Sequence, residues 1–290
     1  MLLQLLSGKA VVELEYFVFR KKLLNLNNPK TFSDKIQWIK LYGGIDQYSK
    51  YVDKYEVRKY IEKTIGRGYL IPLIGVWDTF DAVPFNELPH KFVLKGTHGS
   101  GFNFICHDKS SLDKKLVRDV VSKWLKENYY TRSVETQYKN CTPRIICEKY
   151  MEDDSGSLRD YKFFCFNGIP HIVQVDSDRF KGHKRDLFDA DWRRLPTTLE
   201  HPNSKEDIKK PGKFNEMVEI AKILSKRFPF VRVDLYLIGD KVYFGELTFT
   251  PGNGLEHFKP IDLDYQLGDL IDLSKYRPSH SNGEISGVRS

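Results

Sequence analysis

The sequence predicts an α+β fold in which short strands dominate the middle of the chain. Strand-like segments surround the Asn167-Gly168 turn at residues 159–175 and the Gly239-Asp240 turn at residues 231–248. Turns this short join antiparallel strands, so the sheets are expected to be mainly antiparallel. The amphipathic helical segments lie mostly outside these hairpins, which favours helices on one side of the sheets.

The individual elements follow from local patterns. A helix is expected after Asn28-Pro29, with Thr31 or Ser33 as its cap and an apolar face that includes Ile36. Further helices are expected from residue 52 or 53 to residue 66, over residues 112–129 and after Pro211. Strands are expected at residues 70–77, 92–95, 102–106, 144–151, 159–166, 169–175 and 187–192, and in the hairpin that begins at residue 231.

That last hairpin carries charged side chains on one face. Apolar residues fill the odd positions from 231 to 237, so Arg232 and Asp234 point to the other side of the strand. A three-residue loop at 239–241 would put Asp234 opposite Glu246 and Arg232 opposite Thr248. A two-residue turn would instead place the Glu246 side chain on the other face of the hairpin. Two carboxylates about 5 Å apart repel each other. Mg²⁺ shared with substrate phosphates would relieve the repulsion, and the alternative is a surface hairpin with solvated charges.

A glycine-rich loop at residues 96–101 separates two short strands and follows Lys95. Its glycines let backbone N–H groups approach a phosphate, and Lys95 would add a positive charge. The loop is neither a P-loop nor a dinucleotide-binding fingerprint, because a strand follows it instead of a helix. The alternative is an ordinary hairpin loop.

Two further segments carry candidate binding residues. The strand that ends at Glu148 would offer backbone groups to a purine, with Ile146 and Met151 as apolar walls, or it is simply a buried strand. Lys54 and Arg58 are expected one turn apart on a helix, where a solvated helical face is the alternative.

The composition points to an anionic partner and a reducing compartment. A formal charge of +7 and a pI of about 9.0 suit a nucleotide, an acidic sugar, nucleic acid or a membrane surface. The basic run at residues 179–185 would bind an acidic substrate or form a solvated loop. The four cysteines form no Cys-x-x-Cys pair, so zinc is not expected. No stacked aromatic-basic motif supports nucleic acid as a partner.

The N-terminal stretch predicts a cytoplasmic protein. Residues 1–18 are apolar but interrupted by Lys9, Glu13 and Glu15, and they lack the basic leader of a signal peptide. No run of about 18 apolar residues would span a membrane. The apolar clusters at residues 2–6 and 11–19 leave open a peripheral contact with the inner face of the membrane or a lipid-linked glycan, although packing on the domain is the simpler expectation.

Taken together, the chain resembles the TupA-like ATP-grasp family, a group of ATP-grasp carboxylate–amine ligases associated with teichuronopeptide and capsular polysaccharide synthesis. The resemblance covers about residues 24–273. It depends on the order and spacing of five segments: NPKTFSDKIQW at 28–38, FVLKG at 92–96, EKY at 148–150, DYKFFCFNG at 160–168 and VRVDLY at 231–236.

The resemblance implies that two α+β subdomains clasp ATP. The expected parts are a helical, substrate-side subdomain over 1–80, a lid subdomain over 81–150, a core subdomain with the Mg²⁺ site over 151–275 and a flexible tail over 276–290. Lys54 and Lys95 would contact the phosphates. The residues expected to cover the phosphates are Gly96, Thr97, His98, Gly99, Ser100 and Gly101, and those expected to hold adenine are Glu148, Lys149, Tyr150 and Met151.

The resemblance also assigns the charged hairpin. Asp234 and Glu246 would bind Mg²⁺, Arg232 would stabilise the transferring phosphoryl group, and Lys162 would reach the phosphates. Thr248 stands where the family usually has a metal-binding Asn, which puts a second metal ion in doubt.

The implied reaction is ATP- and Mg²⁺-dependent amide formation through an acyl phosphate. The expected carboxylate is a uronic acid of a surface polysaccharide, and the expected partner is an amine or amino acid. An acidic glycan would be received by Arg179, Lys181, Arg185 and His257. Three alternatives stay open: a glycosyltransferase of the same pathway, an ATP-dependent sugar kinase on the same scaffold, and a non-catalytic nucleotide- or glycan-binding module.

Overall fold

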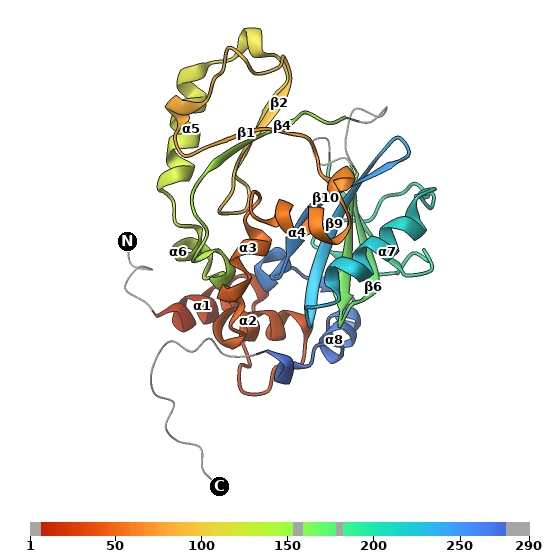
Figure 1. Ribbon diagram of the computed structural model, residues 1–290. Helices are drawn as coiled ribbons and strands as arrows, with labels where there is room; N and C mark the ends of the chain where they lie inside the picture. Colours follow the sequence, from red (N-terminus) through yellow and green to blue (C-terminus); the bar gives the residue numbers. More distant parts are fainter. Residues whose placement is uncertain (1–6, 153–158, 178–181, 277–290) are drawn as a thin grey trace.

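Helices and short strands alternate along residues 7–152, 159–177 and 182–276, which the computed structural model describes (Figure 1). The helices are α1 (Gly8–Arg20), α2 (Phe32–Tyr42), α3 (Ser49–Val52), α4 (Val57–Thr64), α5 (Lys114–Lys126), α6 (Tyr129–Ser133), α7 (Phe214–Ser225) and α8 (Asp262–Asp269). The strands are β1 (Leu73–Trp77), β2 (Phe92–Gly96), β3 (Asn103–Cys106), β4 (Ile145–Lys149), β5 (Asp160–Phe166), β6 (Ile169–Ser177), β7 (Lys184–Asp189), β8 (Thr198–Leu199), β9 (Phe230–Ile238), β10 (Lys241–Thr248) and β11 (Phe258–Lys259).

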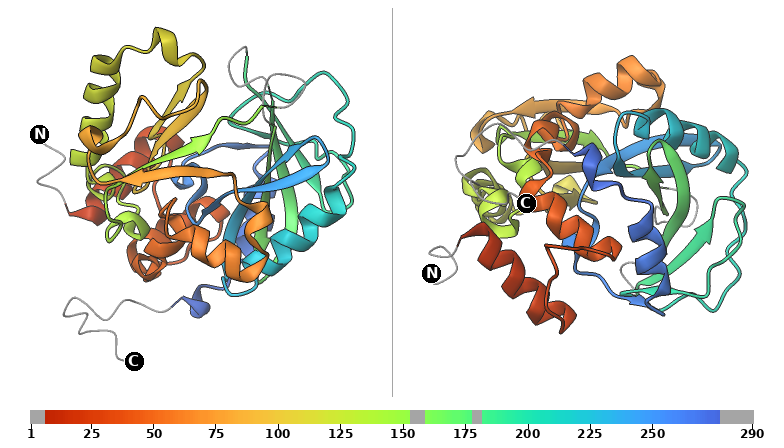
Figure 2. Two further views of the ribbon diagram at one scale, coloured as in Figure 1. Left: turned by 45° about the horizontal axis from the view of Figure 1, so that its top comes forward. Right: turned by 90° about the horizontal axis from the view of Figure 1, so that it is seen from below.

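Two antiparallel sheets organise these elements into two lobes (Figures 1 and 2). The smaller sheet has the strand order β1-β4-β2-β3, and the larger has the order β10-β9-β5-β6-β7. Every strand pairing within both sheets is antiparallel, which confirms the predicted mainly antiparallel α+β class. Strand β1 precedes residue 80 yet pairs with β4, so the small sheet extends beyond the predicted boundary between subdomains.

The small sheet is stabilised by α5, which covers one of its faces. Phe92 and Leu94 alternate with Val93 and Lys95 along β2, and the first two side chains are fully buried. They join Trp124 of α5 in a separate apolar cluster. Because strand side chains alternate between faces, Lys95 points away from α5.

The large sheet is covered by α7 on one face and partly by α2 on the other. Phe163 contacts Phe214 of α7, with ring centroids 6.0 Å apart. On the opposite face, Phe32 of α2 packs against Phe164 and Phe230, with centroids 5.9 and 5.1 Å away. These rings close one end of that face, and the polar side chains of β5 and β9 occupy its other end.

The helix boundaries partly follow the sequence. Thr31 caps α2 as predicted, and its hydroxyl accepts a hydrogen bond from the backbone N–H of Asp34 at 3.0 Å. The helix predicted from residue 52 or 53 to residue 66 is present as α4, but it begins only at Val57 and ends at Thr64. The Asp53 carboxylate accepts hydrogen bonds from the N–H groups of Tyr55 and Glu56, which stabilises a turn before α4.

No helix in the described ranges is long and apolar enough to cross a bilayer.

Candidate active site

In the charged hairpin Asp234 lies opposite Glu246, and this pairing depends on a two-residue turn and a β-bulge. Ile238 pairs with Lys241, so of the two turn lengths considered the structure has the two-residue turn. A regular ladder from this turn would turn Glu246 away from Asp234. The register shifts at Gly245, where a β-bulge adds one residue, and Glu246 therefore pairs with Asp234. A glycine within a strand pattern was the sequence signal for this bulge.

Arg232 holds the acids of this hairpin together. Its Nε and Nη2 atoms donate to the two carboxylate oxygens of Asp234, each at 2.7 Å. Nη2 also lies 3.3 Å from Glu246 Oε1 and 3.2 Å from the Thr248 hydroxyl. Lys162 of β5 donates to Asp234 Oδ2 at 2.9 Å. Asp234 therefore receives three charge-assisted hydrogen bonds, which fix its orientation.

The ionisation of this cluster follows from these contacts. Burial opposes the charge on Asp234, but Arg232 and Lys162 outweigh it, so the pKa of the carboxyl lies below its usual value. Burial likewise opposes the charge on Arg232, but Asp234 and then Glu246 raise the pKa of the guanidinium. Glu246 is the accessible acid of the pair, since 46% of its side chain is exposed against 2% for Asp234.

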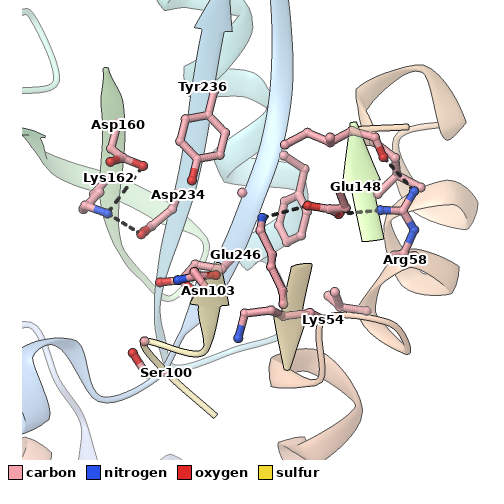
Figure 3. Close-up of a pocket in the computed structure, with 17 residues that line it drawn as sticks. Lys54, Arg58, Ser100, Asn103, Glu148, Asp160, Lys162, Asp234, Tyr236 and Glu246 are labelled. Carbon is pink, nitrogen blue, oxygen red and sulfur yellow. Dashed lines mark hydrogen bonds and ion pairs between the residues drawn. The ribbon is translucent and has the colours of Figure 1, made fainter. Parts of the chain in front are cut away.

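A cleft of about 310 Å³ lies between the two lobes and is bordered by this cluster (Figure 3). Its volume is within the range of small-molecule sites. Eight charged residues line the cleft in equal numbers of each sign: Lys54, Arg58, Lys95, Lys162, Glu148, Asp160, Asp234 and Glu246. Seven of them come from β2, β4, β5, β9, β10 and α4, so both lobes contribute to one charged surface.

Two cations of the cleft, from β2 and α4, converge on Glu148. Lys95 lies 2.7 Å from one carboxylate oxygen, and Arg58 lies 3.0 Å from the other (Figure 3). Lys54 instead donates to the carbonyl oxygen of Gly99, and burial lowers the pKa of its ammonium. The sequence had predicted that Lys54 lies on the same helix as Arg58, but Lys54 precedes α4. It nevertheless lines the cleft together with Arg58.

The glycine-rich loop contributes only its end to the cleft. Ser100 and Gly101 line it, and Gly101 has a φ of 77°, which suits glycine. Thr97 and His98 were predicted to cover the phosphates, but their side chains are buried within the small lobe. Thr97 donates to the Thr142 carbonyl oxygen at 2.9 Å, and a ring nitrogen of His98 lies 2.8 Å from the Trp124 carbonyl oxygen. Gly96 and Gly99 pack against Phe102.

The predicted adenine segment reaches the cleft only at Glu148. Tyr150 instead contacts His107, with ring centroids 5.2 Å apart, and the Lys91 ammonium lies over its ring. Neither Lys149 nor Met151 is among the residues that line the cleft. The residues that supply its apolar walls are Val57, Leu70, Ile71 and Phe244. The sequence did not predict them, because the bridge between Leu70 and Phe244 joins distant parts of the chain.

The loop after Thr248 is supported by buried polar side chains. Gly252, Asn253 and Gly254 all have positive φ angles between 54° and 68°. The Lys40 ammonium donates to the Asn253 side chain at 2.6 Å, and burial lowers the pKa of Lys40 to about 8. Glu135 accepts a hydrogen bond from the Thr250 hydroxyl. These contacts fix the backbone that follows the charged hairpin.

A family model described as "TupA-like ATPgrasp" matches residues 34–272 of this chain. The chain belongs to the TupA-like ATP-grasp family. Membership confirms the predicted ATP-grasp fold and enzyme class, that of the carboxylate–amine ligases that use ATP. A comparison with curated protein sequences finds no match.

Solved structures similar to this TupA-like ATP-grasp chain include two D-alanine–D-alanine ligases. The Bacillus anthracis structure has a TM-score of 0.44 and 17% identity, over 81% of this chain and 67% of that one. The Helicobacter pylori structure has a TM-score of 0.43 and 13% identity, over 87% and 70%. A RimK domain ATP-grasp protein from Sphaerobacter thermophilus has a TM-score of 0.43 and 10% identity, over 78% and 69%. This chain spans about two thirds of the length of these proteins.

The side chains of this TupA-like ATP-grasp cleft are compatible with Mg²⁺ shared with phosphates. Glu246 offers an accessible carboxylate, Thr248 a hydroxyl, and Asp234 a carboxylate that already receives three hydrogen bonds. Within residues 7–152, 159–177 and 182–276, no three His, Cys, Asp or Glu side chains form a metal-binding group. A cation held here would need oxygen ligands from the substrate, which is how Mg²⁺ is usually bound.

Arg185 and His257, two of the predicted glycan-binding residues, lie outside this cleft. Arg185 is buried, and it donates to Asp176 at 2.7 Å and to Glu256 at 2.6 Å. His257 lies 3.1 Å from Glu200. The structure therefore pairs both residues with protein carboxylates. Arg179 and Lys181 lie outside the described residues.

Proposed function

We propose that this chain is an ATP- and Mg²⁺-dependent ligase that joins the carboxylate of a uronic acid to an amine or amino acid. The observation that carries the proposal is the meeting of four cations with the Asp234–Glu246 pair in one cleft between two lobes. The uronic acid is inferred from the family resemblance. The surface-polysaccharide role depends on the same inference.

The cations of the cleft suit a triphosphate. Lys54 donates to the backbone carbonyl oxygen of Gly99 and forms no salt bridge with a described residue, so its positive charge is available to a phosphate oxygen. Glu148 holds Lys95 and Arg58, and both line the cleft together with Lys54. Positioned charges of this kind supply much of the rate enhancement in phosphoryl transfer.

The proposed reaction has two steps. A carboxylate oxygen of the sugar acid attacks the γ-phosphorus, the bond to the ADP oxygen breaks, and an acyl phosphate forms. The amine then attacks the acyl carbon, phosphate leaves, and the amine loses a proton. Arg232 would stabilise the charge on the transferred group, and Glu246, Asp234 and Thr248 would hold Mg²⁺, which neutralises phosphate charge when it is bound.

A product analysis tests this function. The purified chain is incubated with ATP, Mg²⁺ and pairs drawn from a panel of uronic acids and amino acids, and ADP, free phosphate and the amide are measured. A ligase releases ADP and phosphate in equal amounts with the amide. A sugar kinase releases ADP without phosphate, and a glycosyltransferase consumes a nucleotide-sugar instead of ATP; either result would reject the proposal.

Glu246→Ala tests the proposed metal site within the same assay. We expect this variant to remain folded, because the Glu246 side chain is half-exposed, and to lose ATP turnover. Glu219→Ala is the matched control, since Glu219 is an exposed glutamate on α7 outside the cleft. Normal turnover by Glu246→Ala would remove Glu246 from the proposed Mg²⁺ site.

A further inference from the structure

Helix α1 exposes an apolar face to solvent. The exposed fractions are 45% for Leu14, 51% for Phe17, 47% for Val18 and 57% for Phe19, and Leu23 just after the helix reaches 85%. Isolated exposed apolar residues are ordinary, but Leu14, Phe17 and Val18 share one side of the helix at i, i+3 and i+4, and Phe19 and Leu23 extend the exposed apolar surface at its end. We call Leu14, Phe17 and Val18 the outward face of α1.

The opposite side of α1 fixes the helix to the protein. Val12 and Tyr16 are buried, and the Tyr16 hydroxyl donates to Asp34 of α2 at 2.6 Å. Arg20 donates to the buried carboxylate of Asp264 at 2.6 Å. The helix lies at the edge of the molecule beside α2 (Figures 1 and 2). With its inner side held by these contacts, the outward face cannot turn into the core without breaking a buried ion pair.

Basic residues border the outward face. Lys9 lies near the start of α1, and Lys21 and Lys22 follow its end; all three side chains are exposed. Glu13 is the exposed acid on this helix, and it lies 3.8 Å from Lys9. The border is therefore positively charged, in agreement with the formal charge of +7 for the whole chain.

We propose that the outward face of α1 docks on an anionic lipid surface. An amphipathic helix that lies in the membrane interface places Phe and Leu among the acyl chains and Lys beside the headgroups. The Lys21-Lys22 pair favours this partner over a second copy of the chain, because an interface between identical faces would bring like charges together. The face contacts the bilayer from one side, and the active-site cleft is formed by other elements.

Vesicle sedimentation tests the docking. The full chain is mixed with vesicles of phosphatidylcholine alone or of phosphatidylcholine and phosphatidylglycerol in equal amounts. We expect binding to the anionic vesicles that weakens as salt is raised. Phe17→Ser combined with Val18→Ser should lower the partition coefficient at least about tenfold, because two side chains lose their apolar burial. Lys21→Glu combined with Lys22→Glu should remove the preference for anionic vesicles.

Ile223→Ser is the matched control, because Ile223 is an apolar residue of α7 with 46% exposure. We expect it to bind vesicles as the unmodified chain does. Thermal unfolding of each variant checks that the fold is retained. No binding by the unmodified chain, or equal binding by the Phe17/Val18 variant, would overturn the proposal. A dimer in light scattering that the same double variant dissociates would also overturn it, because the face would then join two copies.

Discussion

Replacing Asp234 with Asn tests whether the carboxylate joins the two cations of the hairpin. The substitution keeps the shape of the side chain and removes its charge. The carboxylate now receives three hydrogen bonds of 2.7, 2.7 and 2.9 Å from Arg232 and Lys162. An amide keeps one acceptor oxygen, but its NH2 group would face these donors, so at least one hydrogen bond is lost. Both cations are largely buried, so the loss is not compensated by water.

The expected loss of stability is substantial. Removing one partner of a buried ion pair costs about 3–5 kcal/mol. Glu246 lies 3.3 Å from Arg232, and Asp160 lies 3.8 Å from Lys162, so each cation keeps a more distant carboxylate. We therefore expect about 3 kcal/mol, the lower end of that range. For a chain of this size, the melting temperature should fall by about 6–12 °C.

Chemical denaturation at neutral pH measures this loss. Asp240→Asn is the matched control, because Asp240 lies in the turn of the same hairpin and is exposed. We expect the control to change stability by less than about 0.5 kcal/mol. The same samples are titrated with a fluorescent ATP analogue and Mg²⁺, and Asp234→Asn should bind it more weakly.

The pH dependence gives an independent check. The pKa of Asp234 is lowered in the folded protein, so its contribution is complete above the unfolded pKa of about 3.9 and is lost as the pH falls through the folded value. The difference in stability between the unmodified chain and Asp234→Asn should therefore be constant near neutral pH and shrink in acid. Equal stability of the two proteins at neutral pH would refute the argument.

Three other predictions concern buried and cleft-lining groups. Lys95→Ala should raise the KM for ATP and lower kcat in the ADP-release assay, because a cation that lines the cleft is removed; unchanged kinetics would exclude Lys95 from the phosphate site. His98→Gln should leave the affinity for the ATP analogue within about twofold, since the imidazole is buried outside the cleft; a large loss would return His98 to the phosphate site. Lys40 has its pKa lowered to about 8, so the unfolded chain binds more protons above that pH. The unfolding free energy of the unmodified chain should therefore rise by about 1 kcal/mol relative to that of Lys40→Met between pH 8 and pH 9. Denaturant titrations at pH 8 and pH 9 measure this difference in unfolding free energy, and an equal difference at the two pH values would contradict the prediction.

Local patterns predicted the charged hairpin better than the rest of the site. Period-two alternation placed Arg232 and Asp234 on one face, and the glycine-rich loop identified the cation at Lys95. The sequence left the turn length open, and with the two-residue turn Asp234 lies opposite Glu246 only because of the bulge at Gly245. Alternation alone cannot count an extra residue in one strand.

Contacts between segments that are distant in the chain could not be predicted from the sequence. Arg58 and Glu148 are 90 positions apart, and their ion pair depends on how α4 meets the small sheet. His98 was expected to face phosphate because it lies in a glycine-rich loop, yet its ring turns toward Trp124 of α5. A single sequence carries the composition of a loop but not the side to which each of its side chains turns.

The side of the sheet to which Glu246 points depends on the turn length and the bulge at Gly245 together. Deleting Gly245 would turn the hairpin into an uninterrupted ladder with the same two acids opposed, whereas deleting one residue of the turn would not do so unless the bulge were also lost. Loop length and strand irregularity can therefore change together during evolution without displacing the acids. Homologous hairpins with one residue fewer should therefore lack the bulge and still keep the two acids opposed.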